Sequence, residues 1–196
     1  MTGALFSLRR FAEVRPREDA CELCAAAFGA EHDHLIEPER RHLLCVCRAC
    51  ALLFPSEGEG RLLRVVPRAT RLLDLDDAIW EALGVPVGLA YFFASRRSDE
   101  IVASFPGPAG AVESAVPRPA WRRLCEACPH LDRLAPDVEA LLVSRAPRRR
   151  AAFHVSIDHC YELAGLLRSV RGTMSMADPE VVGAFFADLE RKASGS

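Results

Sequence analysis

Two cysteine pairs near the amino terminus constrain this chain more than any other feature. Cys21 and Cys24 form a first CxxC motif, Cys47 and Cys50 form a second, and residues 25–46 separate them. Two CxxC pairs at such a spacing are typical of a tetrahedral zinc site, in which a knuckle turn and a helix start each supply two thiolates. So short a segment cannot fold on its own apolar core. The sequence therefore predicts one Zn²⁺ bound by these four cysteines.

A fifth cysteine leaves the ligand set open. Cys45 extends the second pair to CxCxxC, so it either replaces Cys47 as a ligand or packs on a strand expected over residues 41–46. The CxxC spacing fits the turn better and favours Cys47. Iron also accepts four thiolates, so a redox carrier with an iron-thiolate site is an alternative. Ala25 and Ala51 stand where rubredoxins normally have glycine, which favours zinc.

Composition and charge indicate a folded cytoplasmic protein. Of 196 residues, 50% are hydrophobic and 27% are charged, which is enough for a packed core. Eight cysteines without an export signal at residues 1–20 favour metal or redox chemistry over disulfides. The longest apolar runs are too short to span a bilayer. A net charge of −2 gives the chain no general attraction to nucleic acid.

The pattern after the cysteine cluster predicts a second unit of α+β class. We expect a treble-clef-like zinc module at residues 1–54, a polar linker at 55–60, and an α+β domain with a mainly antiparallel sheet at 61–196. Strands are expected at residues 62–67, 87–93, 101–105, 112–116, 138–144 and 153–157. Helices are expected at residues 48–54, 74–83, 120–134, 160–168 and 179–192, with Asp158 able to cap the fourth.

The motif between the cysteine pairs suggests an enzymatic alternative. Asp33-His34 is followed by Pro38 in an Asp-His-x-x-x-Pro pattern, between the two CxxC pairs. This order resembles the treble-clef core of His-Me finger nucleases of the HNH type. The resemblance implies that Asp33 would be a catalytic-metal ligand and His34 the general base. The family usually places His directly after the last cysteine, where this chain has Ala51, so the module resembles a degenerate member.

A weaker candidate metal or redox pair lies in the second unit. Cys125 and Cys128 are three residues apart and share a face of the helix expected there. His130, or His159 with Cys160, would have to complete a site. Two buried free thiols on a helix are an equally ordinary explanation.

Ordered segments along most of the chain carry a second resemblance. They are CELC, CVCRACALLF, PVGLAYFF, FPGPAGAVES, PDVEALL and IDHCYEL, spread over roughly residues 20–190. The chain is similar in these segments to an uncharacterised family of actinobacterial proteins encoded beside NiFe hydrogenase genes. The resemblance implies an accessory role in assembly, maturation or association of a hydrogenase. We therefore expect a protein that acts by binding another protein rather than by catalysis, with a His-Me finger nuclease as the alternative.

Overall fold

The computed structural model describes residues 20–72, 75–108, 110–146, 149–170 and 179–194. These residues form two antiparallel sheets together with several helices, which confirms the expected mixed α+β class with mainly antiparallel pairing. Across the described ranges, no helix has both the length and the apolar character needed to cross a membrane.

A three-stranded sheet occupies the amino-terminal part of the chain, in the order β2-β1-β3. Its elements are β1 (Asp33–Glu37), the 3-10 turn η2 (Pro38–Arg40), β2 (His42–Val46), the single turn α1 (Arg48–Ala51) and β3 (Leu63–Val65). Both strand pairs are antiparallel, and β3 pairs with β1 from beyond the polar stretch 55–60. The small sheet thus draws residues from both sides of that stretch, and the division into units 1–54 and 61–196 stays a prediction.

A six-stranded antiparallel sheet forms the larger part of the molecule, in the order β4-β9-β8-β5-β6-β7. Its strands are β4 (Ala69–Leu72), β5 (Leu89–Ser95), β6 (Glu100–Gly107), β7 (Gly110–Ala115), β8 (Glu139–Ala146) and β9 (Arg149–Ser156). The meander β5-β6-β7 was expected from alternating β formers and turn residues, and the pairing confirms it. No sequence pattern predicts β4, because Thr70 and Arg71 are exposed and the strand is short.

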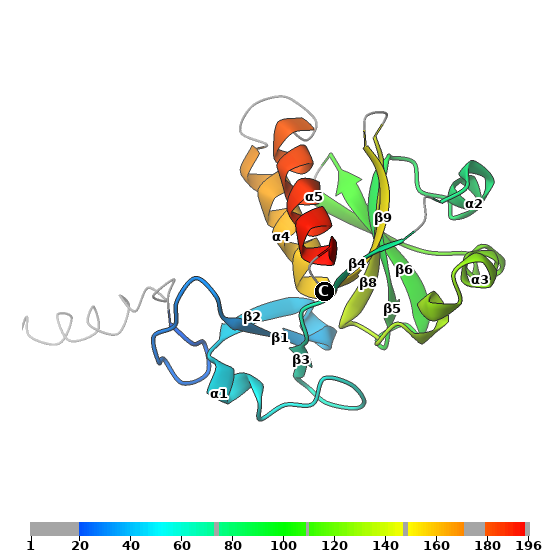
Figure 1. Cartoon of the computed structure of the whole chain (residues 1–196). Coiled ribbons are helices and arrows are strands. Elements are labelled where there is room, and N and C mark those ends of the chain that lie inside the picture. The colour runs from blue at the N-terminus through cyan, green and yellow to red at the C-terminus, as the bar shows by residue number, and fades with distance from the viewer. Residues whose placement is uncertain (1–19, 73–74, 109, 147–148, 171–178, 195–196) are drawn as a thin grey trace, which may run out of the picture.

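Helices cover both faces of the large sheet, which makes three layers (Figure 1). On one face lie α4 (Ile157–Val170) and α5 (Pro179–Ser194), and on the other lie α2 (Asp77–Ala82) and α3 (Arg118–Ala127). Adjacent residues of a strand point to opposite faces of the sheet, so Phe93 packs in the core on the α4–α5 side and Phe92 in the core on the α2–α3 side. The central strand β8 is buried on both faces for the same reason.

Several helix predictions differ from the structure at their ends. The helix expected over 120–134 ends at Ala127 and continues only as a 3-10 turn, η3 (Pro129–Arg133). Proline at 129 disfavours helical dihedrals at the residue before it, and Cys128 accordingly has φ −134° and ψ 79°. Asp158, expected as a helix cap, lies inside the first turn of α4, where its Oδ1 accepts a hydrogen bond from the His159 backbone N–H.

The small sheet packs against the large unit through apolar and polar contacts. Ile36, Leu63 and Val65 are buried in the same core as the α4–α5 face of the large sheet. Arg41, between β1 and β2, has φ 54° and donates from Nη1 to Asp137 Oδ1 at 3.2 Å. The cysteine cluster therefore sits on a small sheet that is fixed to the rest of the molecule.

Candidate metal centre

The structure brings together the four cysteines of the two CxxC pairs. The Sγ atoms of Cys21, Cys24, Cys47 and Cys50 all lie within 4.8 Å of one another. The Sγ atoms of Cys24 and Cys47, one from each pair, are 3.7 Å apart. Four sulfur atoms this close form a donor set that fits a tetrahedral thiolate-bound metal ion.

A tight turn positions the first pair. The Cys21 N–H donates to the Ala26 carbonyl at 2.8 Å, and the Ala25 N–H donates back to the Cys21 carbonyl at 2.7 Å. Ala25 has φ 59°, a left-handed conformation that non-glycine residues seldom adopt, and this folds the turn back on itself. Both side chains of the pair therefore point to the same side.

A helical turn positions the second pair. Cys47 is the N-cap residue of α1, and its carbonyl accepts a hydrogen bond from the Ala51 N–H at 3.0 Å. Cys50 lies one turn later. The helix ends at Ala51, earlier than the expected 48–54, and Leu52 is its C-cap. This single turn is enough to direct two thiols at one point.

Glu22 joins the two halves of the cluster. Its backbone N–H donates to the Cys45 carbonyl at 3.0 Å, and its carboxylate Oε2 accepts from the Cys45 N–H at 2.8 Å. The first turn is thereby held beside the end of β2, next to the second cysteine pair. The side chain of Cys45 itself lies outside the four-sulfur group.

The thiols of the cluster affect one another strongly. Burial alone would raise the pKa of Cys21, but hydrogen bonds from the backbone of Cys47, Cys24 and Leu23 lower it to about 6. The side-chain hydrogen bond with Cys24, together with burial, raises the pKa of Cys50 to about 12. The cluster thus stabilises one thiolate and opposes a further negative charge. Four thiolates together require a cation to balance them.

The apolar core around the cluster is small. Its buried members are Cys21, Leu35, Val46 and Ala51, and two of the predicted ligands, Cys47 and Cys50, pack at its edge. Such a core buries little apolar surface for a segment that also contains two exposed turns. A bound metal would supply the missing cross-link.

Asp33 and His34, the pair expected in the nuclease alternative, lie adjacent on β1 and contact different partners. Asp33 Oδ1 accepts from Arg48 Nη1 at 2.9 Å. His34 Nδ1 lies 3.0 Å from Oδ2 of Asp158, in the first turn of α4. Burial opposes the charge on Asp158, but the hydrogen bond from His34 and further neighbours outweigh it and lower the pKa of Asp158 to about 2.

Cys125 and Cys128 lie far from the amino-terminal cluster, at the end of α3. Both pack against the α2–α3 core, and burial raises the pKa of each thiol. In the part of the chain that the structure describes, neither belongs to a group of three or more metal-binding side chains. His130 instead stacks on His154, with ring centroids 5.9 Å apart.

Sequence reasoning missed a second group of side chains that could hold a metal ion. One ligand atom each from His32, His34 and Cys45 lies within 4.8 Å of the others. A signal was available in the sequence, because His-x-His places two imidazoles on one face of an extended chain. The partner Cys45 could only be found once β1 and β2 were paired.

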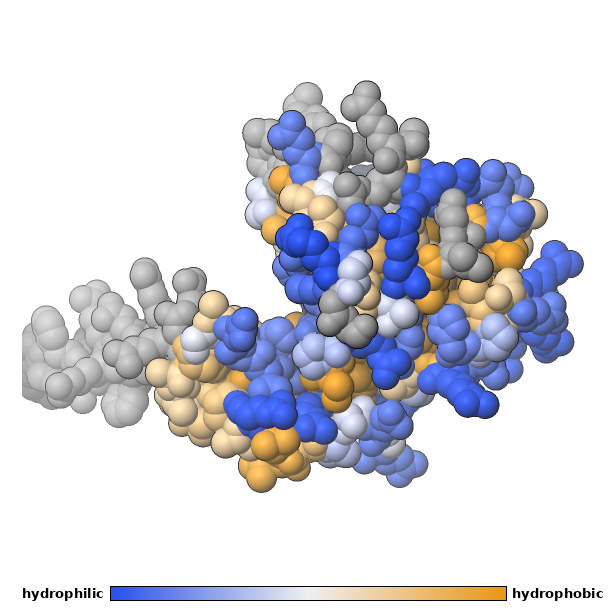
Figure 2. All heavy atoms as spheres, viewed as in Figure 1, coloured by the Kyte–Doolittle hydropathy of each residue, from blue (hydrophilic) through white to orange (hydrophobic). Residues whose placement is uncertain are grey.

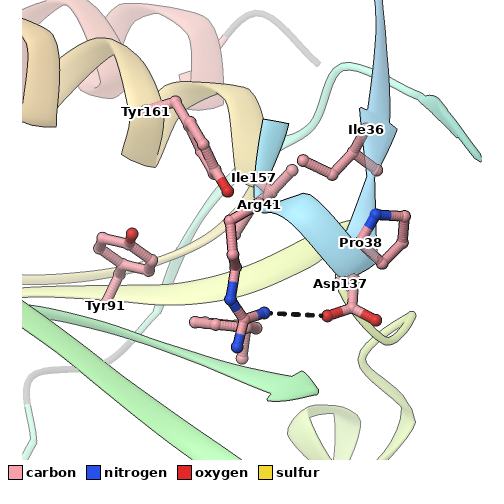
Figure 3. A pocket seen from close by; sticks show the side chains of 8 residues that line it. Ile36, Pro38, Arg41, Tyr91, Asp137, Ile157 and Tyr161 are labelled. Atoms are coloured by element: carbon pink, nitrogen blue, oxygen red, sulfur yellow. Dashed lines mark hydrogen bonds and ion pairs between the residues drawn. The ribbon is translucent and has the colours of Figure 1, made fainter. Parts of the chain in front are cut away.

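A cleft lies where the small sheet meets the large unit. Arg41, Tyr91 and Tyr161 line both a cavity of about 10 Å³ and an adjoining cleft of about 380 Å³ between α4 and strands β5–β7. Figure 3 shows the Arg41 guanidinium extended toward Asp137, with both tyrosine rings on the other side of it. Burial raises the pKa of Tyr91 to about 12. The cleft is mainly apolar, and its polar lining also includes Ser104, Glu113 and Arg168.

Exposed leucines lie beside the cysteine cluster. Leu53 is 78% exposed, Leu52 is 56% exposed, and Leu23, between the two cysteines of the first pair, is 42% exposed. Figure 2 shows apolar surface over the α1 region at the lower edge of the molecule. The aromatic side chains of β5 and α5 do not extend this surface, because Phe92, Phe93, Phe185 and Phe186 are buried.

Comparison with known proteins gives one match. Residues 20–193 match the model of a family described as a family of unknown function (DUF5947). No curated protein matches, and no solved structure matches.

Proposed function

We propose that this chain, which belongs to the family of unknown function DUF5947, is a zinc-binding accessory protein that acts by binding another protein. The observation that carries the proposal is the position of Leu52 and Leu53. These exposed side chains directly follow the cysteine cluster, so a metal that fixes the cluster also fixes them.

Zinc is the metal that the donor set favours. Four cysteine thiols within 4.8 Å of one another suit a closed structural site with no open position for substrate. A knuckle turn, the hairpin β1–β2 and a helix start follow in that order, which supports a treble-clef-like module. Bound there, Zn²⁺ would balance the thiolate charge and stabilise the turns. Cys21, Cys24, Cys47 and Cys50 would be its ligands.

The exposed leucines suit a protein partner. Large apolar side chains that are exposed together in one patch mark interaction sites, whereas single exposed ones need no such explanation. Leu52 and Leu53 are adjacent, and Leu23 lies on the neighbouring turn of the cluster. A surface built of Leu23, Leu52 and Leu53, here called the leucine surface, would bury them against the partner.

The partner we propose is a component of NiFe hydrogenase assembly, maturation or association. This step is supported by the segments that resemble an actinobacterial family encoded beside hydrogenase genes. The leucine surface is the place on this chain where we expect that partner to bind.

Affinity purification tests the proposal. Tagged wild-type chain and a Leu52→Ser, Leu53→Ser variant are expressed in the native host, grown on hydrogen, and their bound proteins are quantified. Wild type should recover hydrogenase components, and the variant should recover at least about tenfold less, since full burial of a leucine side chain is worth about 1.5–3 kcal/mol. Val112→Ser, which changes a 40% exposed valine on β7, is the matched control and should bind as wild type does. Recovery without hydrogenase components, or equal recovery by the leucine variant, would contradict the proposal.

A further inference from the structure

The side chains of His32, His34 and Cys45 converge on one side of the small sheet. His34 on β1 is the direct partner of Cys45 on β2, so their side chains project from the same face. His32 precedes His34 by two residues, and their ring centroids are 4.8 Å apart at an interplanar angle of 75°. One ligand atom of each residue lies within 4.8 Å of the others.

The hydrogen bonds of the two histidines leave one nitrogen of each ring free to bind a metal. His32 Nδ1 lies 3.2 Å from the Ala30 carbonyl, which can only accept, so Nδ1 carries the proton and Nε2 carries the lone pair. His32 Nε2 is buried and has no hydrogen-bond partner among the residues that the structure describes. Packing alone does not explain this unpaired nitrogen, because burying a polar atom without a partner costs free energy of folding.

Asp158 orients the second histidine. Its carboxylate accepts a hydrogen bond from His34 Nδ1 at 3.0 Å, which leaves Nε2 of His34 as the nitrogen with a lone pair. A carboxylate behind a metal-bound imidazole is the usual arrangement that fixes its tautomer and ring angle. Asp158 comes from α4 of the large unit, 124 positions along the chain.

Phe28 holds the other histidine. Its ring stacks on that of His32 with centroids 4.4 Å apart and an interplanar angle of 16°. The contact fixes the His32 ring and shields it on one side. Both imidazoles are therefore pre-positioned by groups that do not themselves bind a metal.

We propose that His32, His34 and Cys45 form a second metal site, distinct from the four-cysteine cluster, for a borderline-soft divalent ion such as Zn²⁺. Two neutral imidazoles and one thiolate are ligands that such ions prefer. Among the described residues this group supplies three ligands, so a fourth position is open to water or an anion. Three protein ligands with one open position are the pattern of reactive rather than structural zinc sites. The site explains the surplus thiol of Cys45 and shares no ligand with the four-cysteine cluster.

Metal titration of the full chain tests the site. Protein stripped of metal is titrated with Zn²⁺, and bound metal is measured after removal of the free ion. We expect a second equivalent in wild type, and its loss in His32→Asn and in Cys45→Ser, with the first equivalent retained. Asp158→Asn keeps all three ligands and should weaken the second equivalent by about 10- to 100-fold. Cys125→Ser, a partly buried cysteine outside both groups, is the matched control.

Cobalt spectra give an independent readout. Co²⁺ in the second site should add a spectrum typical of mixed nitrogen and sulfur ligation, and Cys45→Ser should remove its thiolate-to-metal band. The band of the four-cysteine cluster should persist in that variant, which shows that the module is folded. A single equivalent in wild type, or a second equivalent that survives in both His32→Asn and Cys45→Ser, would overturn the proposal.

Discussion

Cys45 and Cys47 lie two residues apart, yet the structure gives their thiols different neighbours. Cys47 begins α1 and joins the four-sulfur group, whereas Cys45 is the last-but-one residue of β2 and faces His34. The CxxC spacing favours Cys47 for a local reason, since one helical turn is enough to bring Cys47 and Cys50 to the same metal ion. The surroundings of Cys45 depend on the pairing of β1 with β2, which cannot be predicted from the cysteine spacing.

Replacing one cysteine of the cluster should remove the metal and unfold the module. Cys21 is the buried member, so Cys21→Ser takes one of four ligands from the centre of the small core. Structural zinc contributes about 10–16 kcal/mol in zinc-finger peptides at pH 7, and a three-ligand site forfeits much of this. We expect the four-cysteine zinc to be lost and amide protection in residues 20–54 to fall.

Elemental analysis and hydrogen exchange check this outcome. Cys125→Ser is the control, which should keep both the zinc and the amide protection. Iron in place of zinc in the wild type would support the redox alternative instead. Full zinc content in Cys21→Ser would show that the metal has other ligands.

At the scale of elements, what the sequence predicted well was local. The meander β5–β7 and helix α5 follow from alternation, turn residues and proline placement, which nearby residues determine. The pairing of β4 with β9 joins residues far apart in sequence, and no local pattern predicts it. The same holds for the candidate sites: each CxxC pair is local, but the contact of His34 with Asp158 is not.

Glu139 at the start of β8 ties several elements together. Its carboxylate lies 3.1 Å from His154 Nε2 on β9, 3.0 Å from Arg68 Nε, and accepts from the Ala135 N–H at 3.0 Å. Burial alone would raise the pKa of Glu139, but the hydrogen bonds from His154 and Ala135 outweigh it and lower the pKa. The ionised carboxylate therefore stabilises the folded state.

This contribution to stability should depend on pH. Because the folded pKa is the lower one, it is present above the unfolded pKa of about 4.3 and is lost as pH falls through the folded pKa. Glu139→Gln should lower the free energy of unfolding at pH 7 by on the order of 1 kcal/mol. The difference in the free energy of unfolding between wild type and variant should shrink toward acid pH. Urea unfolding across pH measures it, with the exposed Glu81→Gln on α2 as control. A gap that stays constant with pH would exclude the ionised carboxylate as its source.

At the scale of the whole molecule, three kinds of contact hold the small sheet to the large unit. Ile36 enters the α4–α5 core, His34 bonds to Asp158, and Arg41 reaches Asp137. Arg41 also lies over the Phe93 ring, with its guanidinium carbon 4.5 Å from the centroid. The small sheet that carries the cysteine cluster and the large sheet are thus parts of one packed structure.

Arg41→Met should separate the stability of the packing between the two sheets from metal binding by the four cysteines. Methionine retains an unbranched apolar stem but removes the guanidinium from Asp137, whose side chain is 2% exposed. Arg96 still donates to Asp137 at 3.1 Å, so the carboxylate keeps one charged partner. We therefore expect a loss of about 1–3 kcal/mol in the free energy of unfolding, below the cost of leaving a buried charge alone. Zinc content should be unchanged, because Arg41 contacts none of the four cysteines.

The control for Arg41→Met is an arginine that pairs on the same small sheet but lies in solvent. Arg61 Nε is 3.0 Å from Glu37 Oε1, and the Arg61 side chain is 76% exposed. Arg61→Met should change stability by no more than about 0.5 kcal/mol, since solvent screens the exposed Arg61 charge and Arg40 still pairs with the buried Glu37 carboxylate at 3.5 Å. Urea unfolding followed by tryptophan fluorescence compares the two variants. Equal effects would mean that Arg41 is an ordinary surface cation, and the docking of the two sheets would then rest on the apolar contacts of Ile36 and its neighbours.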